Sequence, residues 1–216
     1  SIIFLCLGLS NMQAVIDDIR KGSLSNVEIS MVVSNRSKAG ILERARINNI
    51  PHKFVSIKAP DGSTLSREEY DDRVTSVLKE ANVDLLLMIG YMRIVSPKFS
   101  DDWAGRCLNV HPSLLPAFAG GMDMDVHEKV LKSGVEKTGC TIHLVTAEID
   151  SGPMVLQMEC WVDNEETPES LKAKVQNLEG LAFCRVIEMY QKGELTNTDA
   201  NECIIVKAEP SRRPKY

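Results

Sequence analysis

The sequence begins with the uninterrupted apolar run Ile2-Ile3-Phe4-Leu5-Cys6-Leu7. A strand that is buried on both faces of a parallel sheet reads as such a continuous run, whereas a half-exposed strand alternates. Apolar residues then recur at helical spacing at Met12, Val15, Ile16 and Ile19. The run therefore predicts the first strand of an α/β sheet, followed by a helix.

The same alternation of strand and helix continues to residue 111. Strands are predicted at 27–33, 52–57, 83–89 and 107–111, with a short helix from Ser37 and a longer one after the capping box Ser66-Arg67-Glu68-Glu69. This order predicts an α/β fold, a Rossmann-like, mostly parallel twisted sheet with helices on both faces. Ligands of such sheets bind beyond the carboxyl ends of the strands.

The second half of the chain predicts an antiparallel extension of this sheet. Two further strands are expected at 140–145 and 154–162, and Thr167-Pro168 has the pattern of a helix start. We expect a single domain over residues 1–195. Residues 196–216 are expected to form a C-terminal tail with a hairpin through Cys203–Val206.

Composition excludes several classes of protein. The 216 residues are 44% hydrophobic and 25% charged, and the longest apolar runs are strand-sized, which argues against disorder and a transmembrane helix. A net charge of −5 disfavours nucleic-acid binding, and the basic residues between 207 and 215 are interpreted as a solvated end. Six scattered cysteines without a Cys-x-x-Cys pair indicate a reducing compartment. We expect a cytoplasmic monomer or homodimer with small-molecule substrates and no membrane partner; an organelle is the alternative if an upstream transit segment was trimmed.

The segment Asn109-Val110-His111-Pro112-Ser113-Leu114-Leu115-Pro116 carries the first candidate catalytic residues. Alternation along a strand directs Asn109 and His111 to the same face, at the carboxyl end of the strand. An amide and an imidazolium side by side form a donor pair suited to a developing oxyanion. The alternative is a core histidine whose ring is satisfied by a backbone carbonyl.

A loop at residues 145–152 offers carboxylates. Glu148 or Asp150 is expected to hold His111 protonated or to relay a proton through water, unless the segment is only a solvated acidic loop. His143, on the preceding strand, is interpreted as a structural partner. No metal is expected, because the acidic and histidine residues between 123 and 128 match no zinc or calcium spacing.

Three segments together resemble the folate-dependent formyltransferase family. They are the octapeptide 109–116, Ile89-Gly90-Tyr91-Met92-Arg93-Ile94, and Asp150-Ser151-Gly152-Pro153, and the similarity extends from the first strand to about Leu195. The resemblance implies a metal-free enzyme of purine biosynthesis. Such an enzyme transfers the formyl group of 10-formyltetrahydrofolate, the donor co-substrate, to the amine of 5'-phosphoribosylglycinamide.

The resemblance also implies roles for individual residues. Asn109, His111 and Asp150 would form the catalytic trio. The residues implied to bind the folate are Met88, Tyr91, Met92, Arg93, Ile94, Val95, Val145, Thr146, Ala147, Glu148 and Ile149. The residues implied to bind the phosphorylated acceptor are Gly8, Leu9, Ser10, Asn11, Arg67, Pro112 and Glu179.

One segment departs from the family pattern. The family's first strand ends in Ser-Gly-x-Gly-Ser-Asn, whereas this chain has Cys6-Leu7-Gly8-Leu9-Ser10-Asn11. The leucines place bulk where glycine would let backbone N–H groups approach a phosphate, although the start of the following helix still favours an anion. This departure predicts weakened phosphate binding.

Other functions remain as alternatives at this point. They are a sugar-nucleotide N-formyltransferase, a formyltetrahydrofolate hydrolase and a non-catalytic folate-binding module with a degenerate phosphate loop. A methionyl-tRNA formyltransferase is disfavoured by the length of the chain and its acidic balance.

Overall fold

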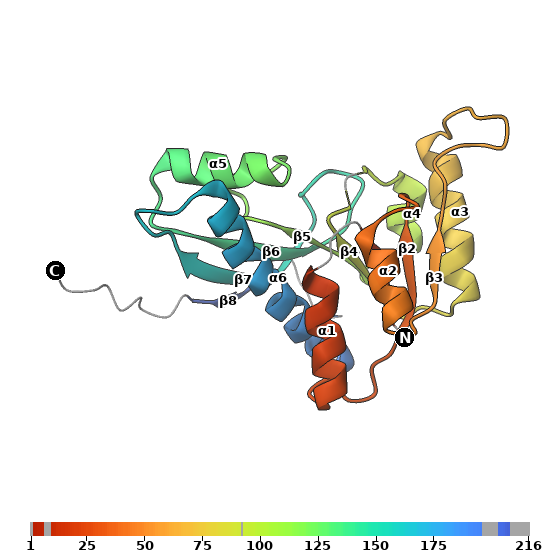
Figure 1. The fold of residues 1–216 in the computed structure, drawn as a ribbon, viewed down its shortest axis with the longest axis horizontal. Helices are drawn as coiled ribbons and strands as arrows, with labels where there is room; N and C mark the ends of the chain where they lie inside the picture. The colour runs from red at the N-terminus through yellow and green to blue at the C-terminus, as the bar shows by residue number, and fades with distance from the viewer. Residues whose placement is uncertain (1, 7–9, 92, 196–202, 208–216) are drawn as a thin grey trace.

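The computed structural model describes residues 2–6, 10–91, 93–195 and 203–207 (Figure 1). The strands are β1 (Ile2–Cys6), β2 (Ile29–Ser34), β3 (His52–Phe54), β4 (Leu85–Ile89), β5 (Cys107–His111), β6 (Lys137–Leu144), β7 (Met154–Trp161) and β8 (Ile204–Val206). The helices are α1 (Ser10–Lys21), α2 (Gly40–Ile47), α3 (Arg67–Glu80), α4 (Pro97–Asp102), α5 (Met124–Ser133) and α6 (Pro168–Gln191).

The described strands form one sheet in the order β3-β2-β1-β4-β5-β6-β7-β8. The strands from β3 to β5 are parallel, and β6 and β7 extend the sheet in the antiparallel sense. The predicted fold class is therefore confirmed. The strand order reverses between β1 and β4, so ligands are expected beyond the carboxyl ends of β1, β4 and β5.

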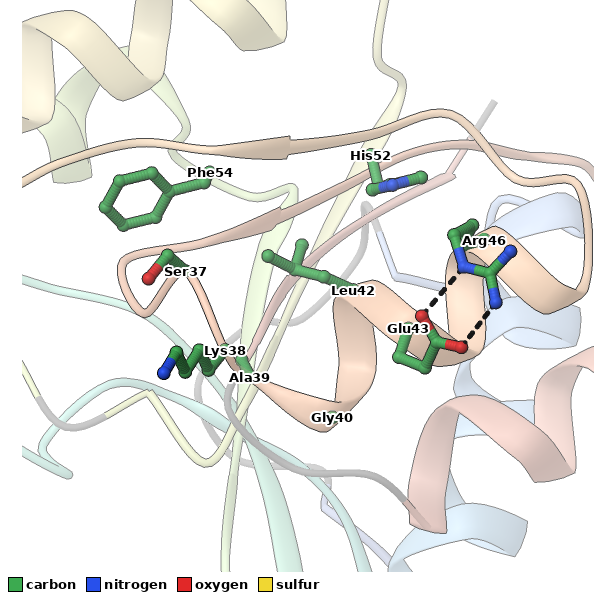
Figure 2. A pocket seen from close by; sticks show the side chains of 9 residues that line it. All are labelled: Ser37, Lys38, Ala39, Gly40, Leu42, Glu43, Arg46, His52 and Phe54. Atoms are coloured by element: carbon green, nitrogen blue, oxygen red, sulfur yellow. Dashed lines mark hydrogen bonds and ion pairs between the residues drawn. The ribbon is translucent and has the colours of Figure 1, made fainter.

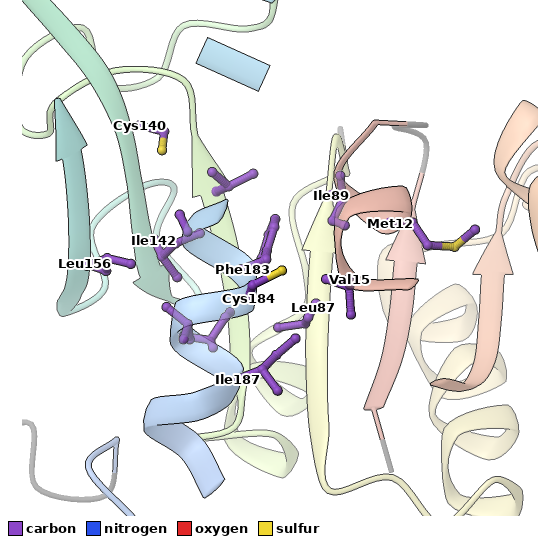
Figure 3. Close-up of a cluster of buried hydrophobic side chains, with 14 of the residues drawn as sticks. Met12, Val15, Leu87, Ile89, Cys140, Ile142, Leu156, Phe183, Cys184 and Ile187 are labelled. Carbon is purple, nitrogen blue, oxygen red and sulfur yellow. The ribbon is translucent and has the colours of Figure 1, made fainter. Parts of the chain in front are cut away.

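Helices cover the sheet on two faces. α1, α2, α5 and α6 bury one core cluster, in which Met12, Phe183 and Ile187 pack against Leu87 and Ile142 of the sheet (Figure 3). α3 and α4 bury a second cluster against the other face, around Tyr70, Leu86 and Phe99. The parallel strand β4 contributes alternate residues to both clusters, which explains why its sequence is apolar without interruption.

Two helix starts follow the signals in the sequence. The Ser66 hydroxyl accepts a hydrogen bond from Glu69 N–H and the Glu69 carboxylate accepts one from Ser66 N–H, which completes the predicted capping box of α3. Thr167 caps α6 in the same way by accepting from Ser170 N–H. Both caps satisfy backbone donors that would otherwise have no partner in the first turn.

The C-terminal hairpin through Cys203–Val206 stays a prediction, because the residues on either side of this strand lie outside the described part of the chain. β8 pairs with β7 in the parallel sense, with Gln157 opposite Ile205. The long helix α6 separates β7 from β8 and returns the chain to the same end of the sheet. Residues 196–202 and 208–216 lie outside the described part of the chain.

Within the described ranges, no helix combines the length and apolar character needed to cross a bilayer.

Candidate active site

A row of polar side chains lies on one face of β5 and β6. Leu108 and Val110 of β5 point into the core under α1, α5 and α6, so the alternate residues Asn109 and His111 face the other way. In the antiparallel pairing of the two strands, Asn109 lies opposite His143, and His111 lies opposite Thr141. Strand alternation together with this register therefore assembles a polar site at the carboxyl end of β5.

His111 is held through both ring nitrogens. Its Nδ1 lies 3.2 Å from Asp150 Oδ2, and its Nε2 lies 3.0 Å from Phe118 O. A carboxylate and a carbonyl oxygen are acceptors only, so each contact requires the ring to donate. This geometry fits the doubly protonated imidazolium, which is the form that stabilises an oxyanion.

The Asp150 carboxylate lies at the centre of the site. Its Oδ2 also accepts from Gly120 N–H at 3.0 Å, and its Oδ1 lies 3.5 Å from His143 Nε2. Burial alone raises the pKa of this carboxyl, but hydrogen bonds from His111, His143 and the Gly120 backbone outweigh burial and hold the pKa well below its ordinary value. Asp150 is therefore a fixed negative charge beside the imidazole at neutral pH.

His143 contributes more to the site than the sequence indicates. Its Nδ1 lies 3.0 Å from Leu144 O, and its Nε2 lies 3.3 Å from Asn109 Nδ2. Nε2 thus lies between the Asn109 amide, which can donate to it, and Asp150 Oδ1, which can only accept from it. The second amide hydrogen of Asn109 stays available for a substrate. Alternation puts His143 and Thr141 on one face of their strand, but only the register with β5 reveals their partners.

A second polar contact joins α1 to α6. Asn11 Nδ2 donates to Glu179 Oε2 at 2.7 Å, and both side chains are buried. Burial raises the pKa of Glu179 to about 7, and the hydrogen bond from Asn11 opposes that rise. Two of the residues implied to bind the acceptor are thus in direct contact.

The segment implied to bind the folate follows β4. Met88 and Val95 are buried in the core cluster of α3 and α4, and Ile94 is exposed. The guanidinium of Arg93 lies 4.6 Å from the centre of the Tyr70 ring, and burial raises the pKa of Tyr91 far above its ordinary value. Met92 lies outside the described residues.

The loop between β6 and β7 carries the other residues implied to bind the folate. Val145 N–H donates to Cys107 O at 2.9 Å, which ties the start of the loop to β5. The Thr146 hydroxyl donates to Glu148 O, whereas the side chains of Ala147, Glu148 and Ile149 are exposed. At Gly152 the backbone at the end of the loop passes close to Leu144 O. A Cβ there would lie 1.9 Å from that oxygen, so the position requires glycine.

The remaining residues implied to bind the acceptor are less closely associated with the contact between Asn11 and Glu179. Gly8 and Leu9 lie outside the described residues, and Ser10 is the first residue of α1. Arg67 is exposed at the start of α3, which packs on the opposite face of the sheet from α6 and Glu179. Pro112 is half-buried directly after His111. The contacts therefore unite Asn109, His111 and Asp150 in one group, and Asn11 and Glu179 in another.

Two further features lie apart from these groups. An open pocket lies between α2 and β3 and shares no lining residue with the predicted site (Figure 2). Across the described part of the chain, no group of three or more His, Cys, Asp or Glu side chains is arranged to hold a metal ion.

The fold and the site together define a class: a Rossmann-like α/β protein with an amide, an imidazole and a carboxylate placed to stabilise an oxyanion. Residues 1–187 match the family model described as formyl transferase. The chain belongs to the formyl transferase family.

Individual relatives agree with this assignment. The chain is 36% identical over 186 residues to the phosphoribosylglycinamide formyltransferase of Escherichia coli K12, an alignment that covers 86% of this chain and 84% of that protein. It is 34% identical to the human trifunctional purine biosynthetic protein adenosine-3, covering 93% of this chain and 19% of that longer protein. The crystal structure of glycinamide ribonucleotide transformylase 1 from Symbiobacterium toebii matches with a TM-score of 0.80 at 34% identity, over 89% of this chain and 87% of that one.

Proposed function

We propose that the chain transfers the formyl group of 10-formyltetrahydrofolate to the amine of 5'-phosphoribosylglycinamide, a step of purine biosynthesis. The observation that carries the proposal is the joint contact of His111 and His143 with Asp150, beside Asn109. Relatives named for this reaction align with most of the chain, including the segments that contain these residues.

The reaction needs donors for a developing negative charge. When an amine adds to a formyl carbon, the formyl oxygen becomes an oxyanion, and preorganised N–H groups stabilise it. Asn109 Nδ2 and His111 Nε2 are the two donors, and Asp150 keeps the imidazole charged through Nδ1. Asp150 also assists, through water, the transfer of the amine proton to the folate nitrogen.

One contact must change when substrates bind. Because Asp150 occupies Nδ1, the donor that His111 offers to the oxyanion is Nε2, and that atom now faces Phe118 O. The loop from 117 to 123 therefore releases this hydrogen bond as the formyl oxygen takes its place. Gly120 N–H, in the same loop, contacts Asp150, so this movement is coupled to the carboxylate.

The roles proposed for the binding residues follow the family resemblance. Residues 88–95 and 145–149 hold the pterin, and the exposed side chains of Ile94 and Ile149 offer apolar surface within these segments. Ser10, Asn11, Glu179 and Arg67 bind the phosphoribosyl part of the acceptor, where the start of α1 favours an anion.

A turnover assay tests the proposed function. The protein is mixed with 5'-phosphoribosylglycinamide and 10-formyltetrahydrofolate, and release of tetrahydrofolate is followed. Wild-type protein is expected to turn over. His111→Ala and Asn109→Ala are each expected to fold and to lose about 10²–10³-fold in kcat, because each removes one preorganised donor. The exposed Glu165→Gln, outside all the proposed binding residues, is the control for loss of a carboxylate charge, with kcat close to that of wild type.

Two results would contradict the proposal. A His111→Ala variant with wild-type kcat would remove the imidazole from the chemistry. Calorimetry that detects folate binding by the wild type, but neither acceptor binding nor turnover, would favour the non-catalytic folate-binding module that Leu7 and Leu9 suggest.

A further inference from the structure

Side chains of two neighbouring strands bind the backbone of the loop that follows His111. The Thr141 hydroxyl donates to Ser113 O at 2.7 Å and accepts from Leu115 N–H at 3.0 Å. Gln157 Nε2 donates to Leu115 O at 2.8 Å and to Thr141 Oγ1 at 3.0 Å. His111, Thr141 and Gln157 form one row across three strands, because His111 lies opposite Thr141 and Thr141 opposite Gln157.

The Thr141 hydroxyl and the Gln157 Nε2 group use all the hydrogens that they can donate in this network. A hydroxyl has one hydrogen and two lone pairs, and all three sites of Thr141 have partners. Both Nε2 hydrogens of Gln157 are also used. Thr141 is 0% exposed and Gln157 8%, so a lost partner would leave a buried polar group unsatisfied. Three buried hydrogen bonds from two side chains therefore restrain the backbone of Ser113 and Leu115.

The network extends to atoms that touch the trio. The Ser113 hydroxyl donates to Ala117 O at 2.6 Å, and the next residue, Phe118, contacts His111 through its carbonyl. Gly120, two residues further on, contacts Asp150. A displacement of Ser113–Leu115 is therefore passed both to the backbone of His111 and to the loop that faces its ring.

We propose that Thr141 and Gln157 are positioning residues for formyl transfer, which rests on the function proposed above. They do not touch the reacting atoms. They fix the backbone of Ser113–Leu115 so that the imidazole of His111 stays aligned with Asp150 on one side and with the formyl oxygen on the other. A displacement of about 1 Å at such a group is sufficient to lower a rate by about 10²-fold.

Three single substitutions separate positioning from stability. Thr141→Val removes the hydroxyl at nearly constant volume, Thr141→Ser keeps it, and Thr138→Val is the matched control. Thr138 is buried on the other face of the same strand, and its hydroxyl has no hydrogen-bond partner among the described residues. The same chemical change can thus be made three residues away without touching the loop.

The expected result is a selective loss of kcat. Thr141→Val is expected to lower kcat by about 10–10²-fold while KM for both substrates stays within about two-fold, because the alignment of the imidazole and not substrate binding is lost. Thr141→Ser is expected to retain most of the turnover, and Thr138→Val to match wild type. If Thr141→Val fails to fold, Gln157→Met is measured by the same criteria, since it leaves Thr141 two of its three partners.

The outcomes also separate this proposal from the proposed function. With an active wild type, equal kcat values in Thr141→Val and Thr138→Val would overturn the positioning role, as would loss of turnover in Thr141→Ser. An inactive wild type would contradict the function instead. In that case hydrogen exchange at the Leu115 amide decides: faster exchange in Thr141→Val than in Thr138→Val supports the fixed loop, and equal exchange refutes it.

Discussion

Glu179 is a buried carboxyl whose charge changes close to neutral pH. It lies on α6 with 7% of its surface exposed, and burial raises its pKa to about 7. Its folded-state pKa is thus above the unfolded value, so the folded protein holds this proton more tightly than the unfolded chain. Glu179 therefore adds stability that is fully present below about pH 4.5 and is lost as the pH rises through about 7.

Glu179→Gln is expected to remove this pH dependence. The variant should match wild type in free energy of unfolding near pH 5 and exceed it at pH 8, by a difference on the order of 1–3 kcal/mol. Urea unfolding at the two pH values measures the effect. Glu169→Gln, at an exposed position of the same helix, is the control. If wild type and Glu179→Gln followed the same pH dependence, the carboxyl would not ionise in this range.

At the residue scale, the sequence predicts the catalytic trio only through resemblance and alternation. Period-two alternation places Asn109 and His111 on one face, and the structure agrees. The contacts of Asp150 depend on a loop whose conformation no local rule determines, including a positive φ of 51° at Asp150 itself. His143 is interpreted from the sequence as a structural partner, but its contact with Asn109 could not be predicted, because that contact depends on the antiparallel register of two strands.

The helices α1 and α6 approach closely at Gly180. They lie side by side in Figure 1, and a Cβ at Gly180 would come within 2.8 Å of Ala14 Cβ. Neither atom belongs to a flexible side chain, so the two helices would have to separate. Such separation would also strain the hydrogen bond between Asn11 and Glu179, which joins the same pair of helices one residue earlier on α6.

Gly180→Ala is expected to be destabilising in spite of the better helix propensity of alanine. Overpacking costs about 1–3 kcal/mol, whereas exchanging glycine for alanine inside a helix gains about 1 kcal/mol. The double variant Ala14→Gly/Gly180→Ala moves the Cβ to the other helix and restores the space. Urea unfolding of the two single variants and the double variant should give a favourable coupling energy. Additive effects would show that the helices do not need this close approach.

At the element scale, strong local signals are predictive and weak ones are not. The capping box at Ser66 predicts α3, the Thr167-Pro168 pattern predicts α6, and the structure confirms both starts. The helix expected from Ser37 begins only at Gly40, where Ala39 provides no side-chain cap. The helix α4 is not among the predicted elements, although Ser96-Pro97 carries a cap and a proline at the first helical position. The parallel pairing of β8 with β7 could not be predicted, because strand pairing across a helix is not a local property.

The whole molecule consists of a parallel half and an antiparallel half of one sheet, and the site lies where they meet, on β5 and β6. Alternating strands and helices predict the parallel half, since each crossover must return the chain to the same edge. Periodicity predicts the strand that becomes β6 but not its position next to β5, which only the structure shows. At this junction β5 and β6 each contribute side chains to the polar row, which explains why Asn109 of β5 and His143 of β6 meet there.

The single domain proposed for residues 1–195 can be tested by truncation after Leu195. Leu195 is buried in the core cluster of α1 and α6, whereas Ile204, Ile205 and Val206 are 39%, 53% and 41% exposed. β8 is the edge strand and pairs with β7, which itself lies two strands away from the strand of His111. Removal of β8 therefore costs a few backbone hydrogen bonds at the edge of the sheet. The truncated chain is expected to unfold in one cooperative transition, with Tm lowered by about 2–8 °C and kcat within about two-fold.

A full-length control identifies the cause of any change. Ile205→Pro keeps the tail but removes a backbone N–H from β8 and distorts its pairing with Gln157. If β8 pairing alone accounts for the lower Tm, this variant and the truncation should behave alike in calorimetry. Loss of turnover in both would extend the functional domain to β8, because Gln157 would then depend on that strand to hold the loop after His111. Loss in the truncation alone would assign the effect to other residues of the tail.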